Sequence, residues 1–209
     1  MKPILLTGFE PFGKWRLNPS QVIVEDFARM PPVPNLVCQV LPTVYEHAGN
    51  RIRSLIAEHQ PQIILCLGLS SQRNLICLER FALNVDDVSQ PDNSKSVRQG
   101  DPIDPVGPAA YRTNVDLEPL LKALIHNGLA AEISNHAGTY VCNHVFYQAL
   151  RANLEAGGQA GTLFMHLPIV KEALEGEAAA QCGWTVGMLT QAVEIVLTGL
   201  IQQSPEANQ

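Results

Sequence analysis

The sequence has 209 residues, 46% of them hydrophobic, which suffices for one sizeable core, so we expect a single domain over residues 1–209. A net charge of -6 without any basic run argues against nucleic acid and anionic membranes as partners, and no window approaches the length of a transmembrane segment. The five cysteines are widely spaced and lack a CxxC motif, which predicts reduced thiols and a cytoplasmic location rather than a disulfide framework.

Predicted strands and helices alternate along the chain. Short apolar runs predict strands at residues 3–7, 36–41, 62–68, 75–85, 130–134 and 162–167. Helical spacing of apolar residues predicts helices that begin near Ser20 (as the N-cap), Pro42, Leu117, Cys142 and Trp184. We interpret residues 86–107, rich in Pro, Asp, Ser and Gly, as a surface loop or flap, and residues 202–209 as a disordered tail. The alternation predicts a sheet layered between helices, with sites at the carboxyl ends of strands.

The stretch around Cys142 combines a flexible turn with the start of a helix. Gly138 and Thr139 supply the turn and a candidate N-cap, and the apolar residues that follow Cys142 have helical spacing. A thiol in the first turn lies at the positive end of the helix dipole, which favours the thiolate. A cysteine nucleophile also needs a base, usually histidine, and a group that orients this base.

The six histidines differ in how well they could serve as that base. Three lie in polar helical stretches and are predicted to be solvated: His47, His59 and His126. His144 follows Cys142 by two residues, about 200° round the helix axis, which favours a structural role. His136 stays open as a candidate. Together with Cys142 and His144 it could bind zinc, but this spacing matches no common zinc pattern.

His166 and Glu79 are polar residues in otherwise apolar strands. A histidine placed like His166 is more often a satisfied core residue than a catalytic one. Glu79 lies in a run that is predicted to be buried, and a buried carboxylate needs a partner. Two alternatives are open for Glu79: a salt bridge with Arg80 or Arg73, or a role in orienting and charging His166.

Eight short motifs, in this order, give the chain a family resemblance. They are GFEPFG at 8–13, NPS at 18–20, LPTV at 41–44, ERFALN at 79–84, PDN at 91–93, GPAAY at 107–111, AGTYVCNH at 137–144 and HLP at 166–168. Together they resemble the pyrrolidone-carboxylate peptidases, also called pyroglutamyl peptidase I, over nearly the whole chain up to about residue 172. The motif that contains Cys142 is the longest and the most specific.

The resemblance implies a catalytic triad of Cys142, His166 and Glu79. It implies an open α/β/α sandwich of the phosphorylase/hydrolase type, with a mixed and mostly parallel sheet. The implied reaction is hydrolysis, through a thioester, of the amide bond after an N-terminal pyroglutamyl (5-oxoprolyl) residue of a peptide. No metal or organic cofactor is implied, and family members are often homotetramers. The implied substrate-binding residues are Phe9, Phe12, Thr43, Leu69, Tyr140 and Val141.

A pocket for pyroglutamate has physical requirements of its own. The residue is a closed lactam without a free amine, so an apolar, aromatic pocket with backbone hydrogen bonds would suit it. Phe9 and Phe12 fit this description, although an alternative is a hydrophobic plug beneath their turn. The backbone N–H of Cys142, in the first helical turn, is a candidate oxyanion donor.

The sequence also departs from the family pattern. Ser71 and Gln72 stand in place of two glycines, Ser89 and Gln90 in place of an arginine and an isoleucine, and Ile169 in place of a tyrosine. Two other functions therefore stay open. One is a cysteine amidohydrolase of the same fold with a shifted substrate, and the other is a binding module without turnover.

Overall fold

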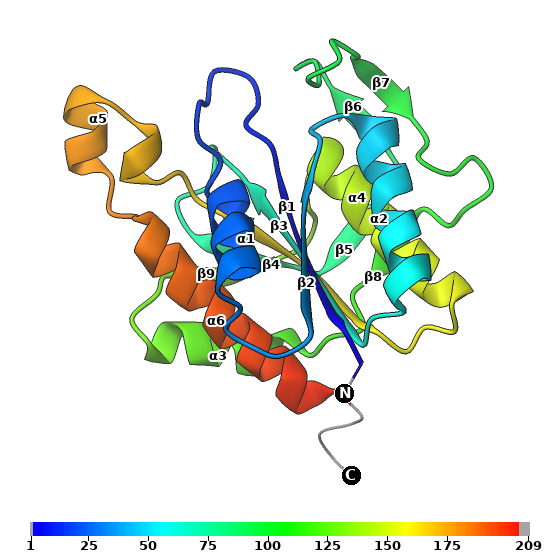
Figure 1. Ribbon diagram of the computed structural model, residues 1–209. Coiled ribbons are helices and arrows are strands. Elements are labelled where there is room, and N and C mark those ends of the chain that lie inside the picture. Colours follow the sequence, from blue (N-terminus) through cyan, green and yellow to red (C-terminus); the bar gives the residue numbers. More distant parts are fainter. Residues whose placement is uncertain (1, 205–209) are drawn as a thin grey trace.

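A mixed sheet forms the centre of the computed structural model, which describes residues 2–204 (Figure 1). Within these residues the sheet has six strands in the order β2-β1-β3-β10-β4-β9. Their bounds are β1 (Ile4–Phe9), β2 (Leu36–Leu41), β3 (Ile63–Leu69), β4 (Ile76–Glu79), β9 (Ala131–Ser134) and β10 (Gly161–Leu167). Strands β2, β1, β3 and β10 run parallel, whereas β4 pairs antiparallel with β10 and parallel with β9. The predicted mixed, mostly parallel sheet is confirmed.

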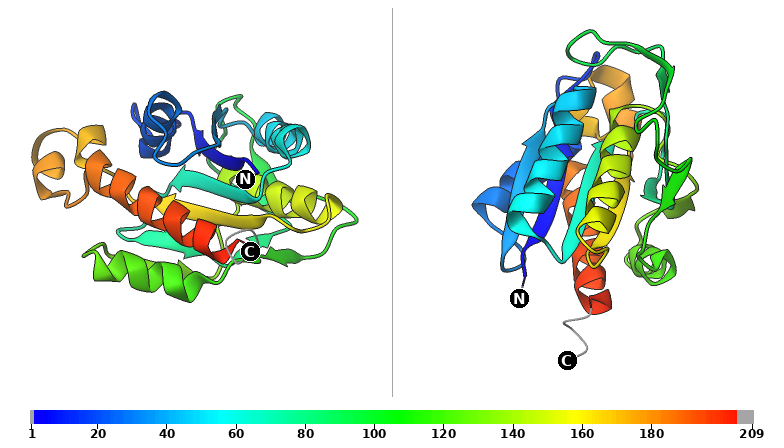
Figure 2. Two further views of the ribbon diagram at one scale, coloured as in Figure 1. Left: turned by 60° about the horizontal axis from the view of Figure 1, so that its bottom comes forward. Right: turned by 90° about the vertical axis from the view of Figure 1, so that its right-hand side faces the viewer.

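Helices cover both faces of this sheet. Their bounds are α1 (Pro19–Arg29), α2 (Tyr45–His59), α3 (Leu117–His126), α4 (Val141–Glu155), α5 (Gly176–Gln181) and α6 (Val186–Gln203), with a short 3-10 helix at Lys171–Ala173. Helices α1, α3 and α6 lie on one face, and α2 and α4 lie on the other (Figure 2). The apolar residues of each set pack against the sheet. The run of β3 is buried along its whole length because both of its faces are covered.

The segment predicted as one strand at 75–85 is two strands in different sheets. The chain leaves the central sheet at Arg80, whose N–H donates to Ser134 and whose carbonyl accepts from Thr113. The strand β5 (Phe81–Leu83) then pairs antiparallel with β8 (Ala110–Arg112). The prediction was wrong because apolar content alone does not show where a strand changes partners.

The segment predicted as a loop or flap at 86–107 contains a hairpin, in which β6 (Asp86–Val88) pairs with β7 (Arg98–Asp101). Its turn is fixed by the Asp92 carboxylate, which accepts hydrogen bonds from Ser94 N and Ser96 N at 2.9 Å and from Tyr45 N at 3.2 Å. Polar contacts within the segment and with Tyr45 of α2 therefore order a stretch that has few apolar residues to bury.

Two predicted helix caps were also wrong. The N-cap of α1 is Asn18, whose side chain accepts from the N–H of Ser20, so that Ser20 lies inside the helix. The N-cap of α4 is Tyr140, without a side-chain cap, because the Thr139 hydroxyl instead donates to the carbonyl of Asp87 at 2.7 Å.

The last part of the chain contains more helix than the sequence predicted. The short helices at Lys171–Ala173 and α5 lack buried residues, so no apolar pattern announced them. Helix α6 begins at Val186, and the Trp184 indole before it donates to the Asn74 carbonyl at 2.8 Å. Residues 202 and 203, which were predicted to be disordered, end this helix, and the predicted tail at 205–209 lies outside the described residues. Within residues 2–204, no helix has the length and apolarity needed to cross a membrane.

Candidate active site

Cys142 lies where the first turn of α4 meets the sheet. It is the second residue of α4. Beneath it lies Gly68 of β3, which pairs in register with His166 of β10. A Cβ atom at Gly68 would lie 2.8 Å from Cys142 Sγ and 2.8 Å from a ring carbon of Phe164. Since real Cβ atoms do not approach sulfur so closely, glycine at position 68 is what gives the Cys142 side chain its space.

A buried pair of a histidine and a carboxylate lies on the adjacent strands β10 and β4. His166 Nδ1 is 2.7 Å from Glu79 Oε1, and the two side chains are 6% and 0% exposed. This contact favours the tautomer with a proton on Nδ1, which leaves Nε2 as the basic nitrogen. Arg73 also contacts Glu79 Oε1, with its Nη1 at 3.2 Å. The sequence left two partners open for Glu79, and the structure shows both contacts. Glu79 forms a salt bridge with Arg73 and also contacts His166.

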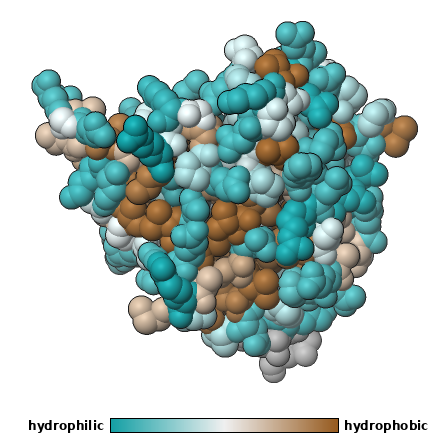
Figure 3. Space-filling model, turned by 45° about the horizontal axis from the view of Figure 1, so that its top comes forward, coloured by the Kyte–Doolittle hydropathy of each residue, from teal (hydrophilic) through white to brown (hydrophobic). Residues whose placement is uncertain are grey.

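Cys142 and His166 line one cleft of about 310 Å³. Three of the predicted substrate-binding residues line it as well: Phe12, Leu69 and Tyr140. Figure 3 tilts the carboxyl ends of the parallel strands forward and shows apolar residues exposed among polar ones on this side of the molecule. The remaining lining residues are Ser70, Ser71, Gln72, Arg73, Val88, Gln90, His136, Ala137, Gly138 and Thr139.

The other predicted substrate-binding residues lie behind the cleft wall. Phe9 is 2% exposed and packs against Phe164 with ring centroids 6.4 Å apart. The Thr43 hydroxyl donates to the Glu10 carbonyl at 2.9 Å and so fixes the turn that carries Phe12. Val141 is fully buried in the core. Their predicted contact with substrate stays a prediction.

Burial acts against ionisation of the Cys142 thiol. Desolvation, followed by the nearby charges of Glu79 and Cys66, raises its pKa to about 12, and a backbone hydrogen bond lowers it only in part. The helix dipole favours the thiolate by only about 1 kcal/mol, which does not offset this burial. A thiolate therefore requires a neighbouring group that accepts the thiol proton, and the His166 ring lines the same cleft.

Comparison with known proteins places this geometry in a family. The family model of pyroglutamyl peptidases matches residues 2–203. The chain belongs to the pyroglutamyl peptidase family. The pyrrolidone-carboxylate peptidase of an Enterobacter species is 36% identical and aligns with 100% of this chain and 97% of its own length. That of Bacillus licheniformis is 36% identical over 82% of this chain and 80% of its own length.

Solved structures of the family share the fold. Pyroglutamyl peptidase I of Bacillus amyloliquefaciens superposes with a TM-score of 0.89 at 31% identity, over 98% of this chain and 99% of its own. A pyrrolidone carboxyl peptidase mutant from Pyrococcus furiosus gives a TM-score of 0.90 at 30% identity, over 97% of this chain and 99% of its own. The α/β fold implied by the resemblance is thus confirmed, and the chain is a member of a family of cysteine-type hydrolases.

A second buried acid and histidine pair lies outside the cleft of this pyroglutamyl peptidase family member. His144 Nδ1 is 2.7 Å from Asp86 Oδ2, and both side chains are 3% exposed. The pair joins α4 to the first strand of the β6–β7 hairpin, whose residues Val88 and Gln90 form part of the cleft wall. Sequence reasoning placed His144 away from the cleft but missed Asp86, since a polar stretch gives no sign that one of its carboxylates is buried.

Replacing His144 with leucine is expected to lower the free energy of unfolding by about 3 kcal/mol, because the Asp86 carboxylate is left buried without its partner. Urea unfolding followed by circular dichroism measures this loss. Arg53→Ala removes the exposed pair that Arg53 forms with Glu155 and serves as the control, with an expected loss of about 0–1 kcal/mol. Equal losses in the two variants would contradict the structural role of the buried pair.

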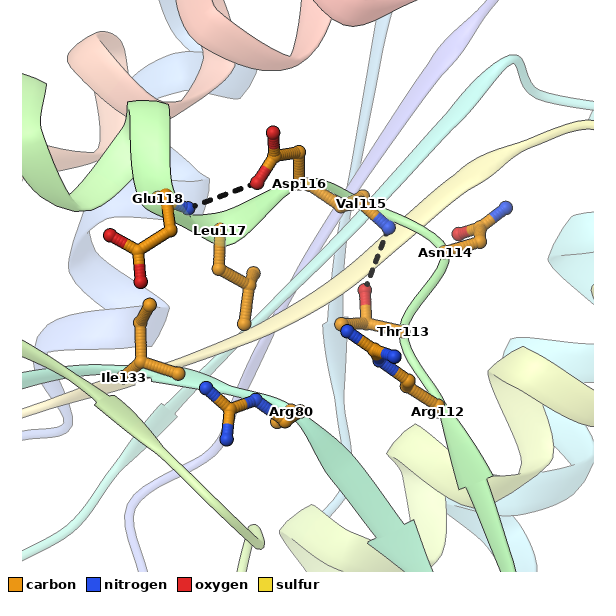
Figure 4. A pocket seen from close by; sticks show the side chains of 9 residues that line it. All are labelled: Arg80, Arg112, Thr113, Asn114, Val115, Asp116, Leu117, Glu118 and Ile133. Carbon is orange, nitrogen blue, oxygen red and sulfur yellow. Dashed lines mark hydrogen bonds between the residues drawn. The ribbon is translucent and has the colours of Figure 1, made fainter.

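The cavity at the start of α3 does not offer an alternative cysteine and histidine site. A larger cavity of about 380 Å³ is lined by Arg80, Arg112, Thr113, Asn114, Val115, Asp116, Leu117, Glu118 and Ile133 (Figure 4). Its lining contains no cysteine or histidine, and its Asp116 and Thr113 side chains accept hydrogen bonds from the backbone around the start of α3. Within residues 2–204, no group of three or more His, Cys, Asp or Glu side chains is placed to hold a metal ion, so the zinc alternative at His136, Cys142 and His144 has no geometric support.

Proposed function

We propose that this chain is a cysteine exopeptidase that removes an N-terminal pyroglutamyl residue from peptides. Membership of the family supports the reaction, and the chemistry of the cleft supports the substrate. No aspartate or glutamate is among the residues that line the cleft in the described part of the chain. A free α-amine would find no counterion there, whereas an uncharged lactam needs none. This absence of a lining carboxylate is the observation that favours a blocked N-terminus over an ordinary one.

The proposed mechanism uses three residues. The Cys142 thiol transfers its proton to His166 Nε2, and the resulting thiolate attacks the pyroglutamyl carbonyl carbon. Glu79 holds the imidazolium by its Nδ1 proton, over the 2.7 Å contact. The backbone N–H of Cys142, in the first turn of α4, stabilises the oxyanion. His166 then protonates the leaving amine, and the peptide departs without its first residue.

Hydrolysis of the thioester completes the cycle. Neutral His166 accepts a proton from water, which attacks the thioester carbonyl and releases free pyroglutamate. The thiolate leaves, and the site returns to its starting state. The lactam ring would occupy the apolar part of the cleft, between Phe12, Leu69 and Tyr140.

The wall at Val88–Gln90 bears on substrate preference. Gln90 lines the cleft where the family resemblance implies isoleucine, and Ser89 takes the place of an arginine expected near the oxyanion. The polar side chain of Gln90 at this wall is compatible with the alternative function, a cysteine amidohydrolase that acts on a different substrate. It also predicts a lower rate than a site that retains both residues.

Release of a chromophore from pyroglutamyl, prolyl and alanyl amides tests the proposed substrate. We expect hydrolysis of the pyroglutamyl amide to be at least about 100-fold faster, because the other two substrates carry a cationic amine into a cleft without a counterion. Comparable rates on all three amides would reject the lactam pocket. Binding of pyroglutamyl peptides without any hydrolysis would instead support the alternative of a non-catalytic module.

We also infer that the protein forms a homo-oligomer, a tetramer by family resemblance, and that it acts in the cytoplasm. The five cysteines, all free in the structure, support a reducing compartment. Size-exclusion chromatography with light scattering tests the oligomeric state, and a monomer at micromolar concentration would contradict it.

A further inference from the structure

Arg73 lines the same cleft as the proposed catalytic residues Cys142 and His166. It follows β3 in the turn that leads to β4, and its side chain is 24% exposed. One guanidinium nitrogen, Nη1, lies 3.2 Å from Glu79 Oε1, and the other, Nη2, donates to the His136 carbonyl at 3.0 Å. One side chain thus connects the carboxylate beneath His166 with the loop that leads to Cys142.

The contact with Arg73 provides the buried Glu79 carboxylate with a cationic partner. Its side chain is fully buried, and its Oε2 atom has no hydrogen-bond partner among the described residues. Oε1 contacts both Arg73 and His166. A buried carboxylate without a nearby cation takes up a proton, and protonated Glu79 would no longer stabilise an imidazolium. Before His166 is protonated, Arg73 is the only cation in contact with Glu79 in the part of the chain that the structure describes.

The charges in the active state balance only when Arg73 is included. Transfer of the Cys142 proton to His166 creates an anion and a cation, next to a carboxylate anion that is already present. Arg73 adds a second cation, so the four charges alternate in sign and sum to zero. Without Arg73 the same buried cluster would carry a net negative charge, which disfavours a further anion on sulfur.

Two other titratable groups near Arg73 do not replace it. Cys77 on β4 contacts Arg73 and Glu132, but burial raises the pKa of its thiol to about 11, so it is neutral at neutral pH. Glu132 on β9 is an exposed carboxylate, which adds negative charge to the surroundings. His136 contributes its backbone carbonyl to Arg73, while its ring Nδ1 accepts from Gly138 N.

We propose that Arg73 is a positioning residue that keeps Glu79 ionised and thereby allows the Cys142–His166 ion pair to form. This inference rests on the proposed roles of Cys142, His166 and Glu79. A purely structural role is the alternative, in which Arg73 only tethers the loop at His136. The two roles differ in one measurable property, the pH at which Cys142 becomes nucleophilic.

Alkylation of Cys142 by iodoacetamide measures this property without any peptide substrate. The rate is followed against pH by mass spectrometry of the peptide that contains Cys142, with Cys182 in the same protein as an internal reference. For Arg73→Gln we expect the acid limb of the Cys142 profile to move up by about one pH unit, which is about a tenfold lower rate on that limb. The profile of Cys182 should not move, because it lies outside the cleft.

Two further variants separate charge from position. Arg80→Gln is the matched control, since it removes the arginine next to Glu79 in sequence, whose guanidinium donates to Asn135 rather than to Glu79. Its Cys142 profile should equal that of the unmodified protein. Arg73→Lys retains the cation and should keep most of the acid limb. If Arg73→Gln does not fold, Arg73→Lys takes its place in the test. An unshifted acid limb in Arg73→Lys supports the proposal. An acid limb shifted as far as that of Glu79→Gln overturns it.

A double-mutant cycle tests whether Arg73 acts through Glu79. If it does, Arg73→Gln in a Glu79→Gln background adds little to the shift that Glu79→Gln causes alone. Additive shifts, or an unchanged acid limb in folded Arg73→Gln, would overturn the proposal. Failure of the proposed function would look different, as an absence of pyroglutamyl amide hydrolysis in the unmodified protein, whatever the alkylation profiles show.

Discussion

Replacing Cys142 with serine is expected to lower kcat/KM for a pyroglutamyl amide by at least about 1,000-fold. The hydroxyl occupies the same space above Gly68 but ionises far less readily than a thiol, and in the proposed mechanism His166 alone accepts its proton. Hydrolysis of a chromogenic pyroglutamyl amide measures the loss. Circular dichroism and urea unfolding should show an intact fold, since the change removes no packing volume of consequence.

Cys182→Ser is the matched control for this experiment. Cys182 is a half-buried free thiol that contacts the Ile169 carbonyl and does not line the cleft. Its replacement should leave hydrolysis unchanged, whereas activity near that of the unmodified protein in Cys142→Ser would eliminate the proposed nucleophile.

Replacing Glu79 with glutamine is expected to lower kcat by about 1,000-fold or more, with a smaller change in KM. Glutamine keeps the shape of the side chain but carries no charge, so it neither stabilises the imidazolium nor requires the tautomer with a proton on Nδ1. It also leaves Arg73 without its anionic partner at Oε1. Steady-state kinetics on the pyroglutamyl amide measure both constants.

Glu132→Gln is the comparison for Glu79→Gln. Both carboxylates lie near Arg73, Glu79 on β4 and Glu132 on the neighbouring strand β9. Glu132, however, is exposed and contacts Cys77 rather than His166. We expect Glu132→Gln to retain nearly full activity. A comparable loss in the two variants would mean that the total charge around Arg73, and not the contact with His166, determines the rate.

The sequence predicted elements whose formation depends on their own residues. The apolar run of β3 and the apolar stripe of α2 are local patterns, and both elements lie where they were expected. The break at Arg80 was missed because it depends on hydrogen bonds to Ser134 and Thr113, which are distant in sequence. The β6–β7 hairpin was missed for a related reason, since Asp86 contacts His144 and Asp92 accepts from Tyr45 N, and both partners are distant in sequence.

In the candidate site, too, local motifs predicted some features, while others depend on contacts between residues that are distant in sequence. The motif around Cys142 located the thiol in the first turn of α4, and the short strand motifs located Glu79 and His166, which the structure brings within 2.7 Å of each other. The sequence could not show that Arg73 and His166 share one oxygen of Glu79. It also could not separate Phe12, which lines the cleft, from the buried Phe9, because both belong to the short motif at 8–13, in which Phe9 ends β1 and Phe12 lies in the turn that follows.

The hydrogen bond from Trp184 to Asn74 gives the protein an intrinsic optical reporter. Asn74 directly follows Arg73, so the indole lies against the backbone of the turn that carries the guanidinium. The only other tryptophan, Trp15, lies in the turn after β1, next to Lys14. Indole emission in a Trp15→Phe background therefore follows the hydration of the β3–β4 turn. We expect loss of the contact between Arg73 and Glu79 to change this emission, so that it can be followed by fluorescence without an attached dye.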